Sequence, residues 1–239
     1  MKSVFIIGCG WLGLPLALRL REQGYAVAGS TSGIERQKTL ESKDIPVYAD
    51  VFQAPLSDFD SIICTIPPLR DQNNDFHHHL ARHIRKIAPK QFIYTSSISV
   101  YPDIPELLDE SRADEGSKQF ELEEIYRKQL PNAMILRLGG LFGWERHPAH
   151  YLSGRKNIAK PEAPINLISG LEVIAAIEYL LRHEKHVPYL NLVNDDQRSR
   201  KEYYTAICEE LEIPAPEFEI SSSGGKRIDN QLWKSLKQS

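Results

Sequence analysis

The sequence predicts an α/β protein built on a doubly wound parallel sheet. Short β-branched runs alternate with segments of helical periodicity, and a glycine-rich turn follows the first of these runs. Strands that alternate with helices form parallel sheets with helices on both faces. The same patterns, taken in order along the chain, predict the individual elements.

Apolar runs predict strands at 4–7, 25–29, 45–48, 61–66, 91–95 and 133–138. Between them, helical spacing predicts helices over 12–20, 76–87 and 117–130. From Trp144 to Pro164 the chain is rich in Pro, His and basic residues and shows no periodicity, which indicates loops and short elements. A helix through 173–181, a strand at 189–193 and a helix through 204–211 follow. We therefore expect a nucleotide-binding domain at 1–143. The smaller substrate-side region at 144–239 would pack some elements back on the sheet.

Composition excludes several classes of protein. The 239 residues carry 29 Lys and Arg against 32 Asp and Glu, a net charge of −3, so nucleic acid is not an expected partner. Cys9, Cys64 and Cys208 are too few and too far apart for a disulfide framework, which favours a reducing compartment. The apolar stretch from Val4 to Leu20 is cut by Gly10, Gly13 and Pro15, which argues against a signal segment. We expect a cytoplasmic protein with a small-molecule substrate and no membrane partner, compatible with a homodimer.

The turn after the first strand carries the pattern G-x-G-x-x-G, formed by Gly8, Gly10 and Gly13 with Trp11 and Leu12 between. It follows a predicted strand and opens a predicted helix, which is the context in which the pattern binds a dinucleotide. Gly8 would allow the tight turn, Gly10 the approach of a pyrophosphate, and Gly13 close packing of helix on strand. The alternative is a tight turn without a ligand.

The end of the second strand predicts the choice of cofactor. A site selective for NAD places a carboxylate there, whereas this chain has Ser30, Thr31 and Ser32, with Arg36 on the next helix. Hydroxyls and a guanidinium suit a 2′-phosphate, so we expect NADP, with NAD as second choice. The alternative for Arg36 is a solvated helix residue.

Two further strand ends are expected to border the cofactor. Asp50 and Val51 follow the third strand and would meet the adenine. Thr65, Ile66 and Pro67 end the fourth strand at the carboxyl edge of the sheet, where ligands of doubly wound folds bind.

Several segments together resemble a known family across nearly the whole chain. They are the glycine turn, Thr-Ser-Ser-Ile-Ser-Val-Tyr at 95–101, Arg-Leu-Gly-Gly-Leu-Phe-Gly at 137–143, Arg-His-Pro at 146–148, Ile-Asn-Leu-Ile at 165–168 and Gly-Lys-Arg-Ile-Asp-Asn at 225–230. The chain resembles an atypical or extended short-chain dehydrogenase/reductase of the NAD(P)-dependent epimerase/dehydratase family, YeeZ-like subgroup. The resemblance implies a Rossmann fold and an oxidoreductase acting on a sugar-like or nucleotide-linked substrate.

The resemblance also implies catalytic roles. Ser97 holds the position of the hydroxyl that polarises the substrate, and Lys118 that of the lysine in Y-x-x-x-K, which binds the nicotinamide ribose. Asp114 stands where the family has the acid/base tyrosine. Tyr126 lies about two helical turns beyond Lys118 and does not fit the motif. Ser97 as a structural hydroxyl and Lys118 as a solvated residue are the alternatives.

Other candidates lie outside these motifs. Arg146 and His147 stand where extended members bind substrate, with capping of local structure as the alternative. His79 and His83 share a helix face, but no third ligand accompanies them, so no metal site is expected. The missing tyrosine leaves a second hypothesis for the whole chain, a catalytically silent NADP-binding redox sensor or regulatory protein.

Overall fold

The computed structural model describes residues 2–67, 74–196, 198–220 and 225–238. The chain divides into two compact units. Unit 1 comprises 1–96, 118–136 and 174–189, and unit 2 comprises 97–117, 137–173 and 190–239. The expected division after residue 143 concerns which region binds cofactor and which binds substrate, and it stays a prediction.

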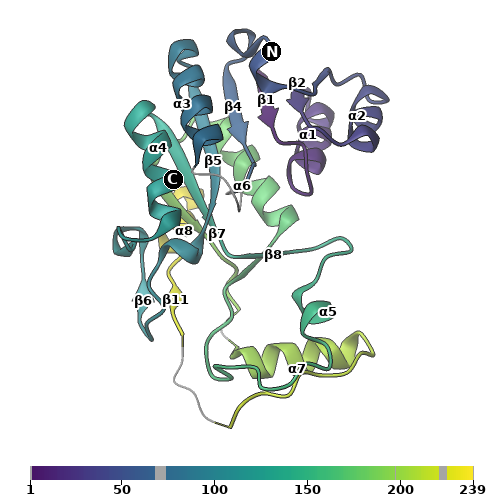
Figure 1. Ribbon diagram of the computed structural model, residues 1–239, viewed down its shortest axis with the longest axis vertical. Coiled ribbons are helices and arrows are strands. Elements are labelled where there is room, and N and C mark those ends of the chain that lie inside the picture. The colour runs from purple at the N-terminus through teal and green to yellow at the C-terminus, as the bar shows by residue number, and fades with distance from the viewer. Residues whose placement is uncertain (1, 68–73, 197, 221–224, 239) are drawn as a thin grey trace. The chain divides into compact units, whose positions relative to one another are not determined.

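A seven-stranded sheet forms the centre of the fold, which confirms the predicted Rossmann architecture (Figure 1). Its strand order is β10-β7-β5-β4-β1-β2-β3. The strands are β1 (Ser3–Ile7), β2 (Ala26–Ser30), β3 (Val47–Tyr48), β4 (Ser61–Cys64), β5 (Gln91–Ser97), β7 (Ala133–Leu138) and β10 (Tyr189–Leu192). The pairs β1–β2, β1–β4, β2–β3 and β4–β5 are parallel.

The strand order reverses beside β1. The chain runs from β1 outward to β2 and β3, then returns to β4 on the other side of β1. Register places Ile7 opposite both Ser30 of β2 and Cys64 of β4, so these three strands end together. Doubly wound sheets bind ligands outside the carboxyl ends of the strands at such a switch point.

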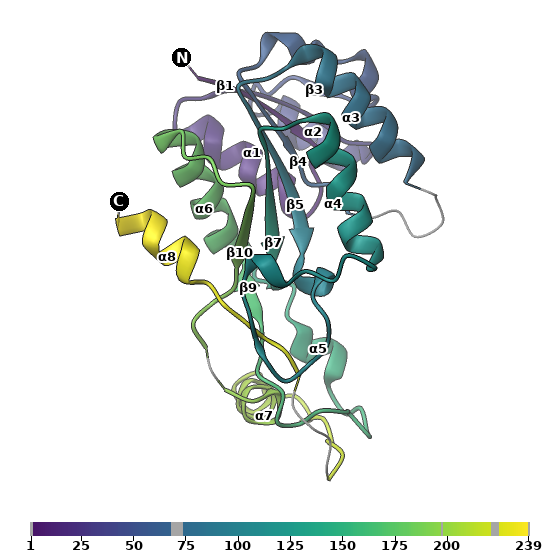
Figure 2. The same ribbon diagram turned by 90° about the vertical axis from the view of Figure 1, so that its left-hand side faces the viewer.

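Helices of unit 1 cover both faces of the sheet (Figure 2). They are α1 (Gly13–Glu22), α2 (Ile34–Glu41), α3 (Asp75–Ile87), α4 (Lys118–Gln129) and α6 (Gly170–His183), of which α6 enters unit 1 at Ile174. On one face, Arg19 of α1 pairs with Glu178 of α6. On the other, Arg85 of α3 donates to Gln129 of α4. The core between sheet and helices is apolar, with Phe5, Leu80 and Tyr126 fully buried.

Unit 2 contains short strands and helices outside the central sheet. Its two small parallel pairs are β6 (Leu107–Leu108) with β11 (Arg227–Ile228), and β8 (Gly140–Phe142) with β9 (Leu167–Ser169). Its helices are α5 (Pro148–Leu152), α7 (Arg200–Glu210) and α8 (Gln231–Gln238). Of these strands and helices, the sequence predicts only α7. Strands of two or three residues are too short to show periodicity in the sequence. In the described ranges no helix is long and apolar enough to cross a membrane.

Candidate functional site

The glycine turn joins β1 to α1 and is anchored to the end of β2. Gly8 has a φ of +90°, a conformation that side chains rarely adopt. The backbone N–H groups of Gly8 and Cys9 both donate to the Ser30 carbonyl oxygen, at 3.1 and 2.7 Å. These bonds fix the turn at the carboxyl edge of the sheet.

Gly13 allows α1 to pack closely on the strand ends. A Cβ atom at Gly13 would overlap the Gly8 carbonyl oxygen and come within 2.8 Å of Thr65 Oγ1. Thr65 lies just beyond β4 and donates to that same carbonyl oxygen at 2.6 Å. Helix, turn and the end of β4 therefore form one tightly packed unit.

Gly10 differs from the other two glycines because, among the described residues, little lies over it. Apart from its chain neighbours, a Cβ atom there would meet no described atom nearer than the Gly8 carbonyl oxygen at 3.8 Å. The helix that follows begins without a side-chain cap and with no acidic residue in its first turn. Leu12 is buried and Trp11 half-buried beside this turn. A helix N-terminus with open space over a glycine fits a pyrophosphate, so these residues suit a bound dinucleotide.

The Cys9 side chain packs inside the turn and is buried. Its Sγ lies 3.7 Å from the Ile6 carbonyl oxygen and occupies the space that a Cβ at Gly29 would need. Burial raises the pKa of the Cys9 thiol to about 12, so the reactive thiolate is not formed at neutral pH.

The residues expected to select NADP divide into two groups. Ser30 and Thr31 are buried, and their hydroxyls accept hydrogen bonds from the backbone N–H groups of Gly8 and Gly33. Ser32 and Arg36 are exposed. The Arg36 side chain folds back toward Gly33, where a Cβ atom would lie 3.1 Å from its Nη1. Ser32 and Arg36 are the two of the four that solvent, and hence a phosphate, can reach.

The other strand ends have mixed surroundings. The Asp50 carboxylate is exposed and accepts from Phe52 N at 3.0 Å, which caps a short 3-10 helix at 51–53. Val51 is buried in the unit 1 core. Ile66 is half-buried beside Gly8, and Pro67 is exposed. Contact of these residues with the cofactor stays a prediction.

Ser97 ends β5 and lies half-buried in unit 2. Its Oγ accepts a hydrogen bond from Ser99 N at 3.1 Å, which begins the 3-10 helix at 98–100 and leaves the hydroxyl proton free to be donated. The residue before it, Ser96, is held by the buried Glu123 at 2.5 Å and by Gln119 at 2.7 Å, both on α4. The end of β5 is thus fixed on its buried side.

Asp114 and Lys118 are both exposed. Asp114 Oδ1 accepts from Gly116 N at 3.0 Å, and Lys118 is the first residue of α4. Their catalytic roles stay predictions.

Two tyrosines near these motifs are buried and engaged elsewhere. Tyr126 is fully buried, and its hydroxyl lies 2.7 Å from His77 Nδ1. The Tyr101 hydroxyl donates to Asn191 at 2.6 Å and accepts from the buried Arg137 at 3.0 Å. Burial raises the pKa of Tyr101 to about 12. Neither hydroxyl can serve as the missing acid/base group.

Unit 2 contains an open cavity of about 390 Å³ on its surface, which the sequence did not predict. We call it the Ser97 cavity. Its lining consists of residues 97–99, 139–140 and 164–167, together with Lys226. Helix α7 contributes Arg200 and Tyr204. These segments are far apart in sequence, although Asn166 and Lys226 stand inside motifs that carry the family resemblance. Asn166 joins them locally, because its Nδ2 donates to the Lys226 carbonyl oxygen at 2.9 Å.

Arg146 and His147 lie at the beginning of α5. Arg146 is exposed, and its backbone pairs with that of Gly143. His147 Nδ1 accepts from Ala149 N at 3.1 Å, while its Nε2 lies 3.0 Å from the Tyr203 hydroxyl. Both nitrogens of His147 are therefore used within unit 2, which matches the capping alternative for this residue.

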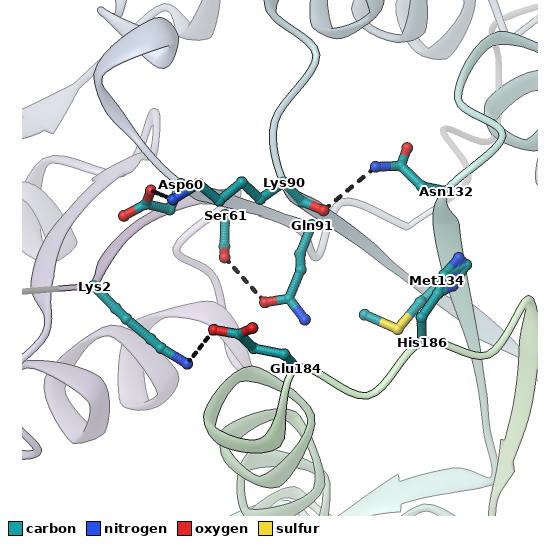
Figure 3. A pocket seen from close by; sticks show the side chains of 9 residues that line it. All are labelled: Lys2, Asp60, Ser61, Lys90, Gln91, Asn132, Met134, Glu184 and His186. Carbon is teal, nitrogen blue, oxygen red and sulfur yellow. Dashed lines mark hydrogen bonds and ion pairs between the residues drawn. The ribbon is translucent and has the colours of Figure 1, made fainter.

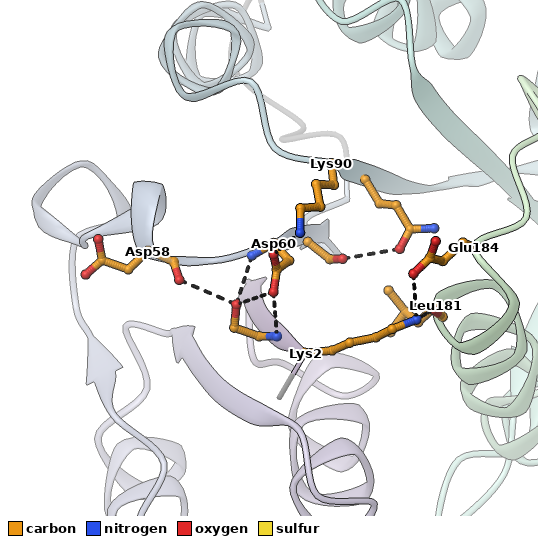
Figure 4. Close-up of polar contacts among 9 residues, drawn as sticks. Lys2, Asp58, Asp60, Lys90, Leu181 and Glu184 are labelled. Atoms are coloured by element: carbon orange, nitrogen blue, oxygen red, sulfur yellow. Dashed lines mark hydrogen bonds and ion pairs between the residues drawn. The ribbon is translucent and has the colours of Figure 1, made fainter.

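A second cavity, of about 540 Å³, lies in unit 1 at the amino ends of the strands (Figure 3). Its charges are paired, as Figure 4 shows: Lys90 with Asp60 at 2.7 Å, and Lys2 with Glu184 at 3.0 Å. Figure 3 also shows Ser61 bonded to Gln91, its partner on the adjacent strand, and the distance is 3.3 Å. A cavity whose polar groups bond one another offers little to a ligand.

The described residues contain no group of three or more side chains suited to a metal ion. His79 stacks on Phe52 with ring centroids 4.5 Å apart, and His83 meets the same ring edge-on at 5.6 Å. The two histidines therefore pack against an aromatic ring.

The fold and the glycine turn define an α/β protein with a Rossmann-type parallel sheet. Comparison with known proteins narrows this class. The chain is 30% identical to Protein YeeZ of Escherichia coli K12, over 97% of this chain and 94% of that protein. It belongs to the YeeZ family. No family model matches the chain.

Solved structures share the fold at low sequence identity. A conserved protein of unknown function from Silicibacter pomeroyi has a TM-score of 0.80 at 17% identity, over 99% of this chain and 93% of that one. The UDP-glucuronic acid 4-epimerase from Bacillus cereus, solved in complex with NAD, has a TM-score of 0.77 at 18% identity, over 99% and 92%. The UDP-N-acetylglucosamine 4-epimerase from Bacillus cereus has a TM-score of 0.77 at 16% identity, over 99% and 93%.

Proposed function

We propose that the chain is an NAD(P)-dependent oxidoreductase of the epimerase/dehydratase type, with NADP preferred and a sugar-like or nucleotide-linked substrate. The observation that carries the proposal is the contrast within the glycine turn. Protein atoms fill the space over Gly8 and Gly13, whereas no described residue fills the space over Gly10. A turn without a ligand would have no need of a glycine at that position.

Unit 1 supplies the cofactor site in this proposal. The N–H groups at the beginning of α1 would receive the pyrophosphate, while Ser32 and Arg36 would contact the 2′-phosphate of NADP. Arg36 is exposed and lies against Gly33, so its guanidinium can turn toward an anion without loss of a buried contact. The UDP-glucuronic acid 4-epimerase from Bacillus cereus was solved in complex with NAD, which supports a dinucleotide cofactor here without deciding between NAD and NADP.

Unit 2 supplies the substrate side. The bound nicotinamide accepts or returns a hydride, so the chain itself must orient the substrate oxygen and move its proton. Ser97 has its hydroxyl hydrogen available in the Ser97 cavity and would donate a hydrogen bond that polarises the substrate oxygen. Asp114 would accept the proton that an alcohol loses on oxidation, and Lys118 would bind the nicotinamide ribose. Arg146 is a further candidate for substrate contact.

The test follows NADPH absorbance while a panel of carbonyl compounds and nucleotide sugars is added to the full chain. The proposal predicts turnover with at least one substrate, abolished in Ser97→Ala and retained in Ser97→Thr, which keeps the hydroxyl. Ser111→Ala is the matched control, since that exposed hydroxyl bonds only to Asp109. Tight NADP binding without turnover on any substrate would instead support the catalytically silent regulatory protein.

A further inference from the structure

The Ser97 cavity is lined by two cationic side chains that form no ion pair with any described residue. Arg200 and Lys226 both line it and are half-buried. The lining contains no aspartate or glutamate. Within the described residues, neither cation forms an ion pair. In the unit 1 cavity, by contrast, Lys2 and Lys90 are each paired with a carboxylate.

Both cations also keep spare donors. Lys226 Nζ donates one hydrogen bond, to the Tyr101 carbonyl oxygen at 2.8 Å, and an ammonium has three donors. Arg200 Nη1 donates to the Ala159 carbonyl oxygen at 2.7 Å, and a guanidinium has five donors. Asn166 is the side chain of the described lining with an amide oxygen, and that oxygen already accepts from Ile228 N at 3.0 Å. The lining therefore offers charged donors without a carboxylate to match them.

The ammonium group of Lys226 is poorly solvated, which makes its unpaired charge unfavourable. Burial lowers the pKa of Lys226, because it leaves the ammonium partly desolvated. The charge of Asp103 opposes this effect in part, but its carboxylate forms an ion pair with Lys160. Beside the cations, Ile98, Ile165 and Leu167 give an apolar wall. A ligand for this cavity would combine a small apolar or ring surface with an anionic group.

We propose that the Ser97 cavity binds an anionic group of the substrate, a carboxylate or a phosphate, through Arg200 and Lys226. The inference rests on the proposed function in taking this cavity as the substrate site. Since Ser97 lines the same cavity, the negative charge lies close to the reacting carbon. The substrate is thus an acid at its reacting end, such as an acidic sugar or a sugar phosphate.

The test measures ligand binding by the full chain in the absence of cofactor, by calorimetry. D-glucuronate and D-glucose 1-phosphate are the two anionic probes, and D-glucose is the matched neutral probe. We expect at least one anionic probe to bind and glucose to bind at least roughly tenfold more weakly, because hydrogen bonds to charged groups are the stronger ones. Binding of glucuronate alone assigns a carboxylate, and binding of the phosphate alone assigns a phosphate ester.

The chain offers matched controls next to each cation. Arg200→Gln and Lys226→Gln should each weaken the bound anion roughly tenfold, while keeping a side-chain donor for the carbonyl that each residue contacts. Lys201→Gln and Arg227→Gln remove the same charge from exposed neighbours outside the cavity and should leave affinity unchanged. If a lining variant does not fold, binding to the unmodified chain is measured at increasing sodium chloride concentration instead. The affinity for the anion should then fall as the salt concentration is raised.

Three results would overturn the inference: glucose binding as tightly as the anions, no binding of either anion, or equal losses in the lining and control variants. None of these depends on NADP. Failure of the proposed function would appear separately, as absence of cofactor binding or turnover.

Discussion

Thr65 Oγ1 donates a hydrogen bond of 2.6 Å to the carbonyl oxygen of Gly8. This bond links the end of β4 to the glycine turn that follows β1, across the point where the strand order reverses. The turn is therefore fixed by side-chain chemistry as well as by its backbone bonds to Ser30.

Replacement of Thr65 by Val removes this bond with little change of shape. We expect Thr65→Val to cost about 1 kcal/mol of unfolding free energy, the usual contribution of one hydrogen bond. NADPH affinity should fall severalfold because the turn loses one of its anchors. Urea unfolding and NADPH fluorescence titration measure the two effects. Thr205→Val, at an exposed position on α7, is the control; an equal effect there would contradict the role of Thr65.

Gly13→Ala tests the close packing of α1. The added methyl group would overlap the Gly8 carbonyl oxygen and crowd Thr65, so the turn must shift. We expect a loss of about 1–3 kcal/mol of unfolding free energy, as for other overpacked sites. Thermal or urea unfolding measures it. Gly24→Ala is not a useful comparison, because the φ of +84° at Gly24 adds strain of its own. Unchanged stability of Gly13→Ala would show that the packing is looser than described.

Arg36→Ala tests the preference for NADP. Loss of a charge-assisted bond to the 2′-phosphate should weaken NADP binding by roughly tenfold or more and leave NAD binding unchanged. Lys38→Ala on the same helix is the matched control, since Lys38 pairs with Glu35 at 2.9 Å. Equal affinity of wild type and Arg36→Ala for NADP, or a clear preference of the wild type for NAD, would refute the assignment.

His77 should make the stability of the chain depend on pH. Burial lowers the pKa of His77 from 6.5 to about 4, so the folded state favours the neutral ring. Since the unfolded chain takes up the proton first, the stability contributed by neutral His77 is complete above pH 6.5 and is lost as the pH falls toward 4. Urea unfolding across this range should show a steeper decline for wild type than for His77→Gln. Parallel curves for the two proteins would argue against this titration.

Local patterns were enough to predict the cofactor side of the fold. The strands β1 and β7 and the helix α4 were predicted to within a residue or two, because buried strands and amphipathic helices leave their period in contiguous sequence. The packing of Gly13 on the strand ends also followed, since the role of each glycine depends only on its place in the turn.

The Ser97 cavity could not be predicted in this way. Its lining unites residues as distant as Ser97, Arg200 and Lys226, and the strands that bring segments of unit 2 together, such as β9 and β11, are two or three residues long. The use of both His147 nitrogens depended likewise on Tyr203, 56 residues away. Pairing over such distances in sequence leaves no periodic signal.

The measurement that tests the central claim most directly is NADPH titration of the wild type and Gly10→Ala. Apart from its chain neighbours, a methyl group at Gly10 has no atom of the described residues nearer than 3.8 Å, so stability should change by less than about 0.5 kcal/mol, as for other unobstructed substitutions. If the open space receives the pyrophosphate, NADPH should bind the wild type and lose at least roughly tenfold in affinity, about 1.4 kcal/mol, in the variant. No binding of NADPH or NADH by the wild type, or equal affinity in both proteins, would contradict the account.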